Sequence, residues 1–178
     1  MKLVLVDRDG VINEELPGYV TSPEELRIMP AAFEAFALFK SKGYTCVVIT
    51  NQSVVGRGII TQSELDKIHA FLCTRINGNG GKIDAVYVCT DRPDNAGERR
   101  KPRSGMLLEA LAKYGAVPGE TPFIGDALTD LEAAHAAGCR RYLVKTGKGS
   151  DAMHKIPERL HPVTLCTDIL DAARKIVS

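Results

Sequence analysis

The sequence predicts an α/β fold in which a mostly parallel sheet carries helices on both faces. Short, continuous apolar runs alternate along the chain with longer stretches of helical period, a pattern typical of parallel sheets. These runs show no alternation of apolar and polar residues, as expected of strands buried on both faces. No repeat, low-complexity tract or long linker divides the chain, so residues 1–178 are predicted to form one domain.

Five apolar runs are predicted to be the strands of this sheet. Each run is short and gives way to polar residues or glycine, which is typical of a buried strand. The runs lie at residues 3–6, 46–49, 85–88, 122–124 and 142–144.

Five helices are predicted between and after these strands. Residues 31–40 have apolar side chains at helical spacing, and Gly43 follows as a stop signal. Thr61 opens the next helix, because the Thr-Gln-Ser-Glu segment at 61–64 forms a capping box. The remaining helices are predicted at residues 105–114, 129–137 and 168–177.

Composition excludes several classes of partner. The net charge is +1, from 23 basic and 22 acidic residues, so no charge excess favours a nucleic acid or a membrane surface. No apolar run approaches the roughly 18 residues of a membrane span, and the amino terminus lacks the regions of a signal peptide. We therefore expect a cytoplasmic protein, and the even spread of charge favours a monomer.

Polar residues at the strand ends indicate a site, because ligands of open α/β sheets bind beyond the carboxyl ends of the strands. Asp7 and Asp9 follow the first strand at a spacing that lets both carboxylates face one pocket. A bound cation such as Mg²⁺ would relieve their repulsion. Asp-Gly is also a common turn dipeptide, and a turn explains Asp7-Arg8-Asp9-Gly10 equally well when this segment is taken alone.

A third carboxylate favours the cation site over the turn. Asp126 lies at the end of the fourth strand, ahead of the next helix, whereas Asp130 is explained in part as a helix cap. Thr50-Asn51-Gln52-Ser53 follows the second strand with groups that can bind phosphoryl oxygens. The cation-rich segment 99–103 suits a phosphate group. Together these are the parts for metal-assisted phosphoryl transfer through an aspartyl-phosphate.

Four segments, in order, resemble the motifs of haloacid dehalogenase (HAD) superfamily phosphatases. They are Asp7-Arg8-Asp9-Gly10-Val11-Ile12-Asn13, Thr50-Asn51-Gln52-Ser53, Arg100-Lys101-Pro102 and Gly125-Asp126-x-x-x-Asp130. Within this superfamily the chain is similar to the branch that removes one phosphate from heptose bisphosphates. The resemblance implies a Rossmann-like HAD fold, a phosphosugar substrate and Mg²⁺ as cofactor.

The resemblance also implies a role for each motif residue. Asp7 would be the nucleophile, and Asp9 would be the general acid and base. Thr50 would hold a phosphoryl oxygen. Lys101 would stabilise the charge on Asp7 and on the transferring group, and Arg100 would help to bind the substrate. We expect partial desolvation on substrate binding to raise the pKa of Asp9.

The same resemblance implies that Mg²⁺ is held by Asp7, Asp126 and the Asp9 carbonyl. Thr50 lies 43 positions after Asp7, which leaves no room there for a large cap domain. The site is therefore expected to be open, with loops 14–19 and 92–100 supplying specificity. The predicted substrate-binding residues are Asn13, Glu15, Pro17, Gly18, Tyr19, Asn51, Gln52, Ser53, Arg57 and Arg99.

The cysteines indicate reduced thiols and no structural zinc. The chain has five cysteines, none in a C-x-x-C pair. Many heptose bisphosphate phosphatases have a zinc loop of C-x-H and C-x-C before the R-K-P motif, but here Cys89-Thr90-Asp91 keeps one cysteine only. One thiol cannot build a four-ligand zinc site, so we expect a shortened loop held by its own turns and salt bridges.

Several alternatives remain open at this point. Histidinol-phosphate phosphatase shares the four motifs, but the extra cations Arg92, Arg99 and Arg103 favour a substrate with two phosphates. A polynucleotide 3′-phosphatase lacks support because the chain has no broad basic excess. A phosphoacceptor or phosphosugar-binding domain without turnover would not require the acid and base Asp9. The histidines His69 and His135 are interpreted as packed or surface residues, and residues 146–161 have no assigned role.

Overall fold

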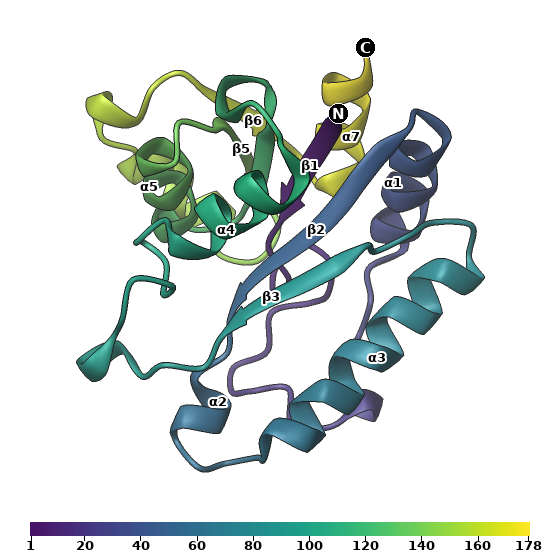
Figure 1. The fold of residues 1–178 in the computed structure, drawn as a ribbon, viewed down its shortest axis with the longest axis vertical. Coiled ribbons are helices and arrows are strands. Elements are labelled where there is room, and N and C mark those ends of the chain that lie inside the picture. Colours follow the sequence, from purple (N-terminus) through teal and green to yellow (C-terminus); the bar gives the residue numbers. More distant parts are fainter.

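The computed structural model describes residues 1–178 and contains one six-stranded sheet. The strands are β1 (Lys2–Val6), β2 (Tyr44–Asn51), β3 (Ala85–Cys89), β4 (Pro122–Gly125), β5 (Arg140–Val144) and β6 (Val163–Cys166). Their order is β3-β2-β1-β4-β5-β6, and every neighbouring pair is parallel. Chain order therefore reverses at β1, whose neighbours are β2 and β4. Figure 1 shows β1 beside β2.

Helices cover both faces of this sheet, and β1 shows how the sequence divides between them. Val4 and Val6 pack with one set of helices, whereas Leu3 and Leu5 pack with the other, because successive side chains of a strand point to opposite faces. The first set is α1 (Pro30–Ser41), α3 (Gln62–Gly78) and α7 (Ile169–Val177), and the second is α4 (Gly105–Tyr114) and α5 (Leu128–Ala136). Two one-turn helices, α2 (Ser53–Gly56) and α6 (Gly149–Ala152), lie in connections.

The predicted strands and helices are confirmed, with boundaries that differ by a few residues. Strand β2 is longer than its apolar run and includes Thr50 and Asn51, which were predicted to follow it. Strand β6 was missed because it is a short edge strand with a half-exposed Val-Thr-Leu-Cys sequence and no continuous buried run. None of the helices has the length and apolar character needed to cross a membrane.

The topology places three strand ends side by side. β1 lies between β2 and β4, so the residues that follow these strands meet at the point where the strand order reverses. The connection from β1 to β2 contains one 3₁₀ turn (Pro23–Glu25) and helix α1, so no inserted domain covers this edge. The edge of the sheet is therefore open to a ligand.

Candidate active site

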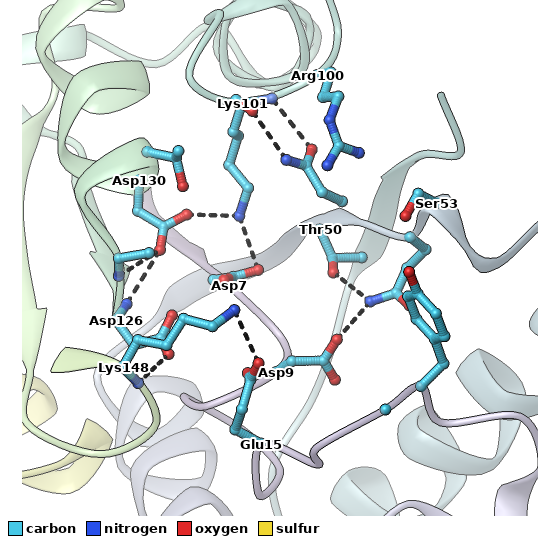
Figure 2. Close-up of a pocket in the computed structure, with 16 residues that line it drawn as sticks. Asp7, Asp9, Glu15, Thr50, Ser53, Arg100, Lys101, Asp126, Asp130 and Lys148 are labelled. Carbon is cyan, nitrogen blue, oxygen red and sulfur yellow. Dashed lines mark hydrogen bonds and ion pairs between the residues drawn. The ribbon is translucent and has the colours of Figure 1, made fainter. Parts of the chain in front are cut away.

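A polar cavity of about 270 Å³ lies beyond the carboxyl ends of β1, β2 and β4 (Figure 2). Only two of its 16 lining residues are hydrophobic, so the cavity suits a charged, hydrophilic ligand. It is lined by Asp7, Asp9, Glu15, Gly18, Tyr19, Thr50, Asn51, Gln52, Ser53, Arg100, Lys101, Asp126, Ala127, Thr129, Asp130 and Lys148.

Lys101 joins two carboxylates at the floor of the cavity. Its Nζ lies 2.8 Å from Asp7 Oδ1 and 2.7 Å from Asp130 Oδ1, and all three side chains are largely buried (Figure 2). Burial alone would lower the pKa of Lys101, but the charges of Asp130 and Asp7 outweigh it and raise that pKa. Lys101 is therefore a fixed cation beside Asp7.

Asp7 has one oxygen held by the protein and one directed to no protein donor. Oδ1 accepts hydrogen bonds from the Arg8 backbone N–H at 2.8 Å and from Lys101, whereas Oδ2 has no hydrogen-bond partner. Burial and the nearby Asp130 carboxylate raise the pKa of Asp7 well above its usual value, although Lys101 opposes this. A bound cation would favour the ionised form that a nucleophile needs.

Asp126 brings a further carboxylate to Asp7. Burial and the Asp130 charge raise the pKa of Asp126 to about 7. One ligand oxygen each from Asp7, Asp126 and Asp130 lies within 4.8 Å of the others. Both oxygens of Asp130 are already engaged, because Oδ1 pairs with Lys101 and Oδ2 accepts from the Asp126 and Ala127 backbone N–H groups. The geometry thus leaves Asp7 and Asp126 as the available ligands, and such hard oxygen donors fit Mg²⁺.

Asp9 lies in a different electrostatic environment from Asp7. Burial favours its neutral form, but the Arg8 charge and hydrogen bonds from Asn13 and Gln52 outweigh burial and lower the pKa of Asp9. Asn13 Nδ2 donates to Oδ1 at 2.9 Å, and Gln52 Nε2 donates to Oδ2 at 2.7 Å. In this structure Asp9 is therefore held as a carboxylate, and the rise expected on substrate binding remains a prediction.

The residues at the end of β2 have two distinct functions in the structure. Thr50 lines the cavity, and its Oγ1 accepts a hydrogen bond from Gln52 Nε2 at 3.0 Å. Asn51 instead forms a pair of hydrogen bonds with the backbone of Lys101: its Nδ2 donates to the Lys101 carbonyl at 3.0 Å, and its Oδ1 accepts from the Lys101 N–H at 3.1 Å. The Asn51 side chain thus fixes the loop that carries Lys101.

Among the clustered cations, Arg100 and Lys101 reach the cavity. Arg92 pairs with Asp94 at 2.7 Å, and Arg99 pairs with Glu109 at 2.9 Å. Arg103 donates to the Ala96 carbonyl. The structure therefore gives no support to a role of Arg92, Arg99 and Arg103 in binding a second phosphate, because none of these side chains lines the cavity.

Most of the predicted site residues line the cavity, and four do not: Asn13, Pro17, Arg57 and Arg99. Asn13 is fully buried and supports Asp9, as described above. Arg57 Nε lies 3.4 Å from Ser53 Oγ, so it contacts a residue of the cavity wall.

Lys148 and Asp130 are cavity residues that the predicted site omitted. Lys148 Nζ pairs with Glu15 at 2.9 Å, and its backbone N–H donates to Asp126 Oδ2 at 2.8 Å. The loop that carries Lys148 follows strand β5. The strand-end rule that singled out Asp7 and Asp126 therefore applies to this loop as well.

The loop before Lys101 is held by its own contacts. Asp91 Oδ2 accepts from the Gly97 N–H at 2.9 Å, and Arg100 Nη1 donates to the Asp91 carbonyl at 2.7 Å. These two contacts join both ends of the loop, and the Arg92–Asp94 ion pair adds a local contact within it. The buried thiol of Cys89 lies at its start, where burial raises the pKa of that thiol. Absence of structural zinc stays a prediction.

Comparisons with known proteins agree with this geometry. A HAD-hydrolase-like family model matches residues 98–172. D-glycero-β-D-manno-heptose-1,7-bisphosphate 7-phosphatase of Pseudomonas putida is 39% identical, over 99% of this chain and all of that protein. The enzyme of that name from Bordetella bronchiseptica is 34% identical, over 99% of this chain and 98% of that protein.

A solved structure extends the similarity to three dimensions. The crystal structure of D,D-heptose 1,7-bisphosphate phosphatase from B. bronchiseptica, complexed with magnesium and phosphate, matches with a TM-score of 0.94 and 34% identity. It covers 99% of this chain and 98% of that one. The chain thus belongs to the D-glycero-β-D-manno-heptose-1,7-bisphosphate 7-phosphatase family of HAD-like hydrolases, and it is a phosphatase.

Proposed function

We propose that the chain removes the C7 phosphate from D-glycero-D-manno-heptose 1,7-bisphosphate and releases heptose 1-phosphate for nucleotide-heptose synthesis in the cytoplasm. The observation that carries the proposal is Asp7, which has one oxygen held by Lys101 and the other directed to no protein donor, in a cavity shared with Asp9. The names of the relatives support the substrate and favour its β anomer.

In the first step, Asp7 attacks the phosphorus of the C7 phosphate. The bond between phosphorus and the C7 oxygen breaks as the new bond to Asp7 forms, and Asp9 gives its proton to the departing oxygen. A phosphate dianion beside Asp9 favours the protonated acid, because it adds negative charge against which the carboxylate must ionise. The product of this step is an aspartyl-phosphate at Asp7.

In the second step, water releases the phosphate. Asp9 now takes a proton from the water, whose oxygen attacks phosphorus while the bond to Asp7 breaks. Asp9 is left protonated, as the next first step requires. The hydrogen bonds that Asn13 and Gln52 donate to Asp9 suit its carboxylate form in this step.

The remaining cavity residues bind and neutralise charge. Lys101 lies against Asp7 and stabilises the transferring group, and the Thr50 hydroxyl holds a phosphoryl oxygen. Asp7, Asp126 and the Asp9 carbonyl would hold Mg²⁺, which supplies positive charge to the phosphoryl oxygens. Arg100 and Lys148, on opposite sides of the cavity in Figure 2, are the cations available to the second phosphate.

Phosphate release tests this proposal directly. The substrates are both anomers of heptose 1,7-bisphosphate and histidinol phosphate, each with Mg²⁺ and with EDTA. We expect fast release from the heptose that requires Mg²⁺ and is lost in Asp7→Asn. Asp66→Asn, which changes an exposed carboxylate on α3, is the matched control and keeps full activity.

The other outcomes separate the alternatives. Release from histidinol phosphate alone would retain the reaction and reject the sugar substrate. Stable phosphate on Asp7 without turnover would indicate a phosphoacceptor domain. Release that persists in Asp7→Asn would reject Asp7 as nucleophile.

A single species of the chain's mass, 19.3 kDa, in solution would support the monomer.

A further inference from the structure

Arg8 lies between Asp7 and Asp9 in the sequence, and its cationic side chain is fully buried. Its Nε donates to Asp9 Oδ1 at 3.0 Å, and its Nη2 lies 2.8 Å from Oδ1 and 3.0 Å from Oδ2 of the same carboxylate. Because a guanidinium is a rigid, planar fork, its orientation determines where the Asp9 carboxylate lies. Whatever holds the far side of this guanidinium therefore also positions Asp9.

The group on that far side is His69. Arg8 Nη1 lies 3.1 Å from His69 Nε2, and the imidazole is 8% exposed. Arg8 has donors and no acceptor, so Nη1 donates and Nε2 accepts, with the imidazole proton on Nδ1. Burial and the Arg8 charge agree with this neutral form, because they lower the pKa of His69 to about 4.

Helix α3 fixes the position of His69. The Thr61–Glu64 capping box sets where the helix begins, and Leu65, Ile68 and Leu72 bury the same side of the helix in the core. His69 reaches Arg8 from a helix that contributes no residue to the cavity. The contact joins a rigid element of the fold to the loop that carries Asp9.

We propose that His69 is a positioning residue for Asp9 and acts through Arg8. The inference rests on the proposed reaction, in which Asp9 protonates the leaving oxygen. His69 holds Nη1 and thereby fixes the guanidinium plane, and the guanidinium holds both oxygens of Asp9. Loss of the His69 acceptor leaves the buried Nη1 donor of Arg8 unpaired. The Arg8 guanidinium then shifts, together with the Asp9 carboxylate that is bonded to it.

The readout is the dependence of kcat/KM on the leaving group. Expulsion of a sugar alkoxide needs a proton from Asp9, whereas p-nitrophenolate leaves without one. We expect His69→Leu to lower kcat/KM about tenfold or more for the heptose bisphosphate and much less for p-nitrophenyl phosphate. His69→Gln, whose amide oxygen can accept from Arg8, restores most of the loss, and the shorter Asn does not.

Controls separate positioning from general destabilisation. Ile76→Val changes another buried residue of α3, about two turns from His69, and is expected to leave the ratio of the two esters unchanged. His135→Leu makes the same substitution at an exposed histidine and is expected to leave kcat/KM unchanged for both esters. The Gln and Asn variants decide the question if His69→Leu does not fold, because both keep a polar side chain.

Three results would overturn the inference: an equal loss on both esters, no loss in folded His69→Leu, or equal activity of the Gln and Asn variants. ¹⁵N NMR gives an independent readout, since a proton found on Nε2 of His69 would also reject it. If the wild type does not hydrolyse heptose bisphosphate but hydrolyses another sugar phosphate, only the substrate proposal fails. The His69 variants are then compared on that sugar phosphate and p-nitrophenyl phosphate. Inactivity on every ester would refute both.

Discussion

Individual side chains of the site face the cavity, hold their neighbours in place, or do both. Asn51 does both, because it lines the cavity, where its amide is predicted to bind substrate, and it also holds Lys101. The nitrogen and the oxygen of its side-chain amide each form a hydrogen bond with the backbone of Lys101. Sequence spacing cannot show this pairing, because the partners lie 50 positions apart.

We expect Asn51→Ala to release the loop that carries Lys101. Loss of two hydrogen bonds should lower the free energy of unfolding by about 1–3 kcal/mol and should lower kcat, because Lys101 no longer lies fixed against Asp7. Urea unfolding and steady-state kinetics measure the two effects. Asn79→Ala, at an exposed helix end, is the control, and an Asn51→Ala variant with a raised KM and unchanged kcat would indicate direct substrate binding instead.

At the scale of elements, the site depends on how closely the loop after β1 approaches Asp126 and the loop that carries Thr146. Gly10 follows β1 with φ +78°, a Cβ on it would meet the Asp126 carboxylate, and its carbonyl accepts from Thr146 Oγ1 at 2.6 Å. Gly43 has a similar φ of +74°, but a Cβ there would meet nothing. The two positions therefore share the backbone strain of a left-handed residue and differ in steric contact.

Alanine at these two positions separates strain from displacement of Asp126. Gly43→Ala should cost about 1–2 kcal/mol of stability and leave activity unchanged. Gly10→Ala should cost more, and it should also raise the Mg²⁺ concentration needed for half-maximal activity, because Asp126 must move. Thermal unfolding and Mg²⁺ titration of activity measure this, and identical Mg²⁺ requirements for both variants would contradict it.

The loop from Cys89 to Lys101 carries a second prediction at this scale. Its ends are joined by the contacts of Asp91 with Gly97 and Arg100, and its start offers one thiol. We expect protein that has been stripped of metal and reloaded with Mg²⁺ to contain no stoichiometric zinc by elemental analysis. One zinc per chain would reject the prediction.

Whether an element could be predicted from the sequence depends on how deeply it is buried. Strands such as β1, with a continuous buried run, were evident, whereas the half-exposed edge strand β6 has no such signal. Asp7 and Asp126 were found because strand ends meet in a parallel sheet. The contact of His69 with Arg8 could not be found, because it depends on how α3 packs against a loop 61 positions away.

For the whole molecule, the carboxylates of the cavity link stability to pH and to Mg²⁺. The pKa of Asp126 is about 7 in the folded chain, against about 3.9 in an unfolded one. The folded state therefore binds more protons between these values, and the free energy of unfolding of the metal-free protein falls as pH rises through this window. Burial of Asp7 acts in the same direction.

His69 acts in the opposite direction over part of this range. Its pKa is lowered to about 4, so the unfolded state binds more protons between about pH 4 and 6.5. The net slope below pH 6.5 therefore mixes both contributions. Asp126→Asn isolates the carboxylate, because the amide oxygen can still accept from the Lys148 N–H while the side chain no longer titrates.

We expect the stability advantage of Asp126→Asn over the metal-free wild type to grow from pH 5 to pH 8, by an amount on the order of a few kcal/mol. Mg²⁺ competes with the protons for Asp7 and Asp126, so the increase in Tm that it produces in the wild type grows over the same range and is largely lost in the variant. Thermal unfolding in EDTA and in Mg²⁺, at constant ionic strength, measures both. A stabilisation by Mg²⁺ that is equal at pH 5 and pH 8 would show that no proton is displaced, and it would place the cation on other ligands.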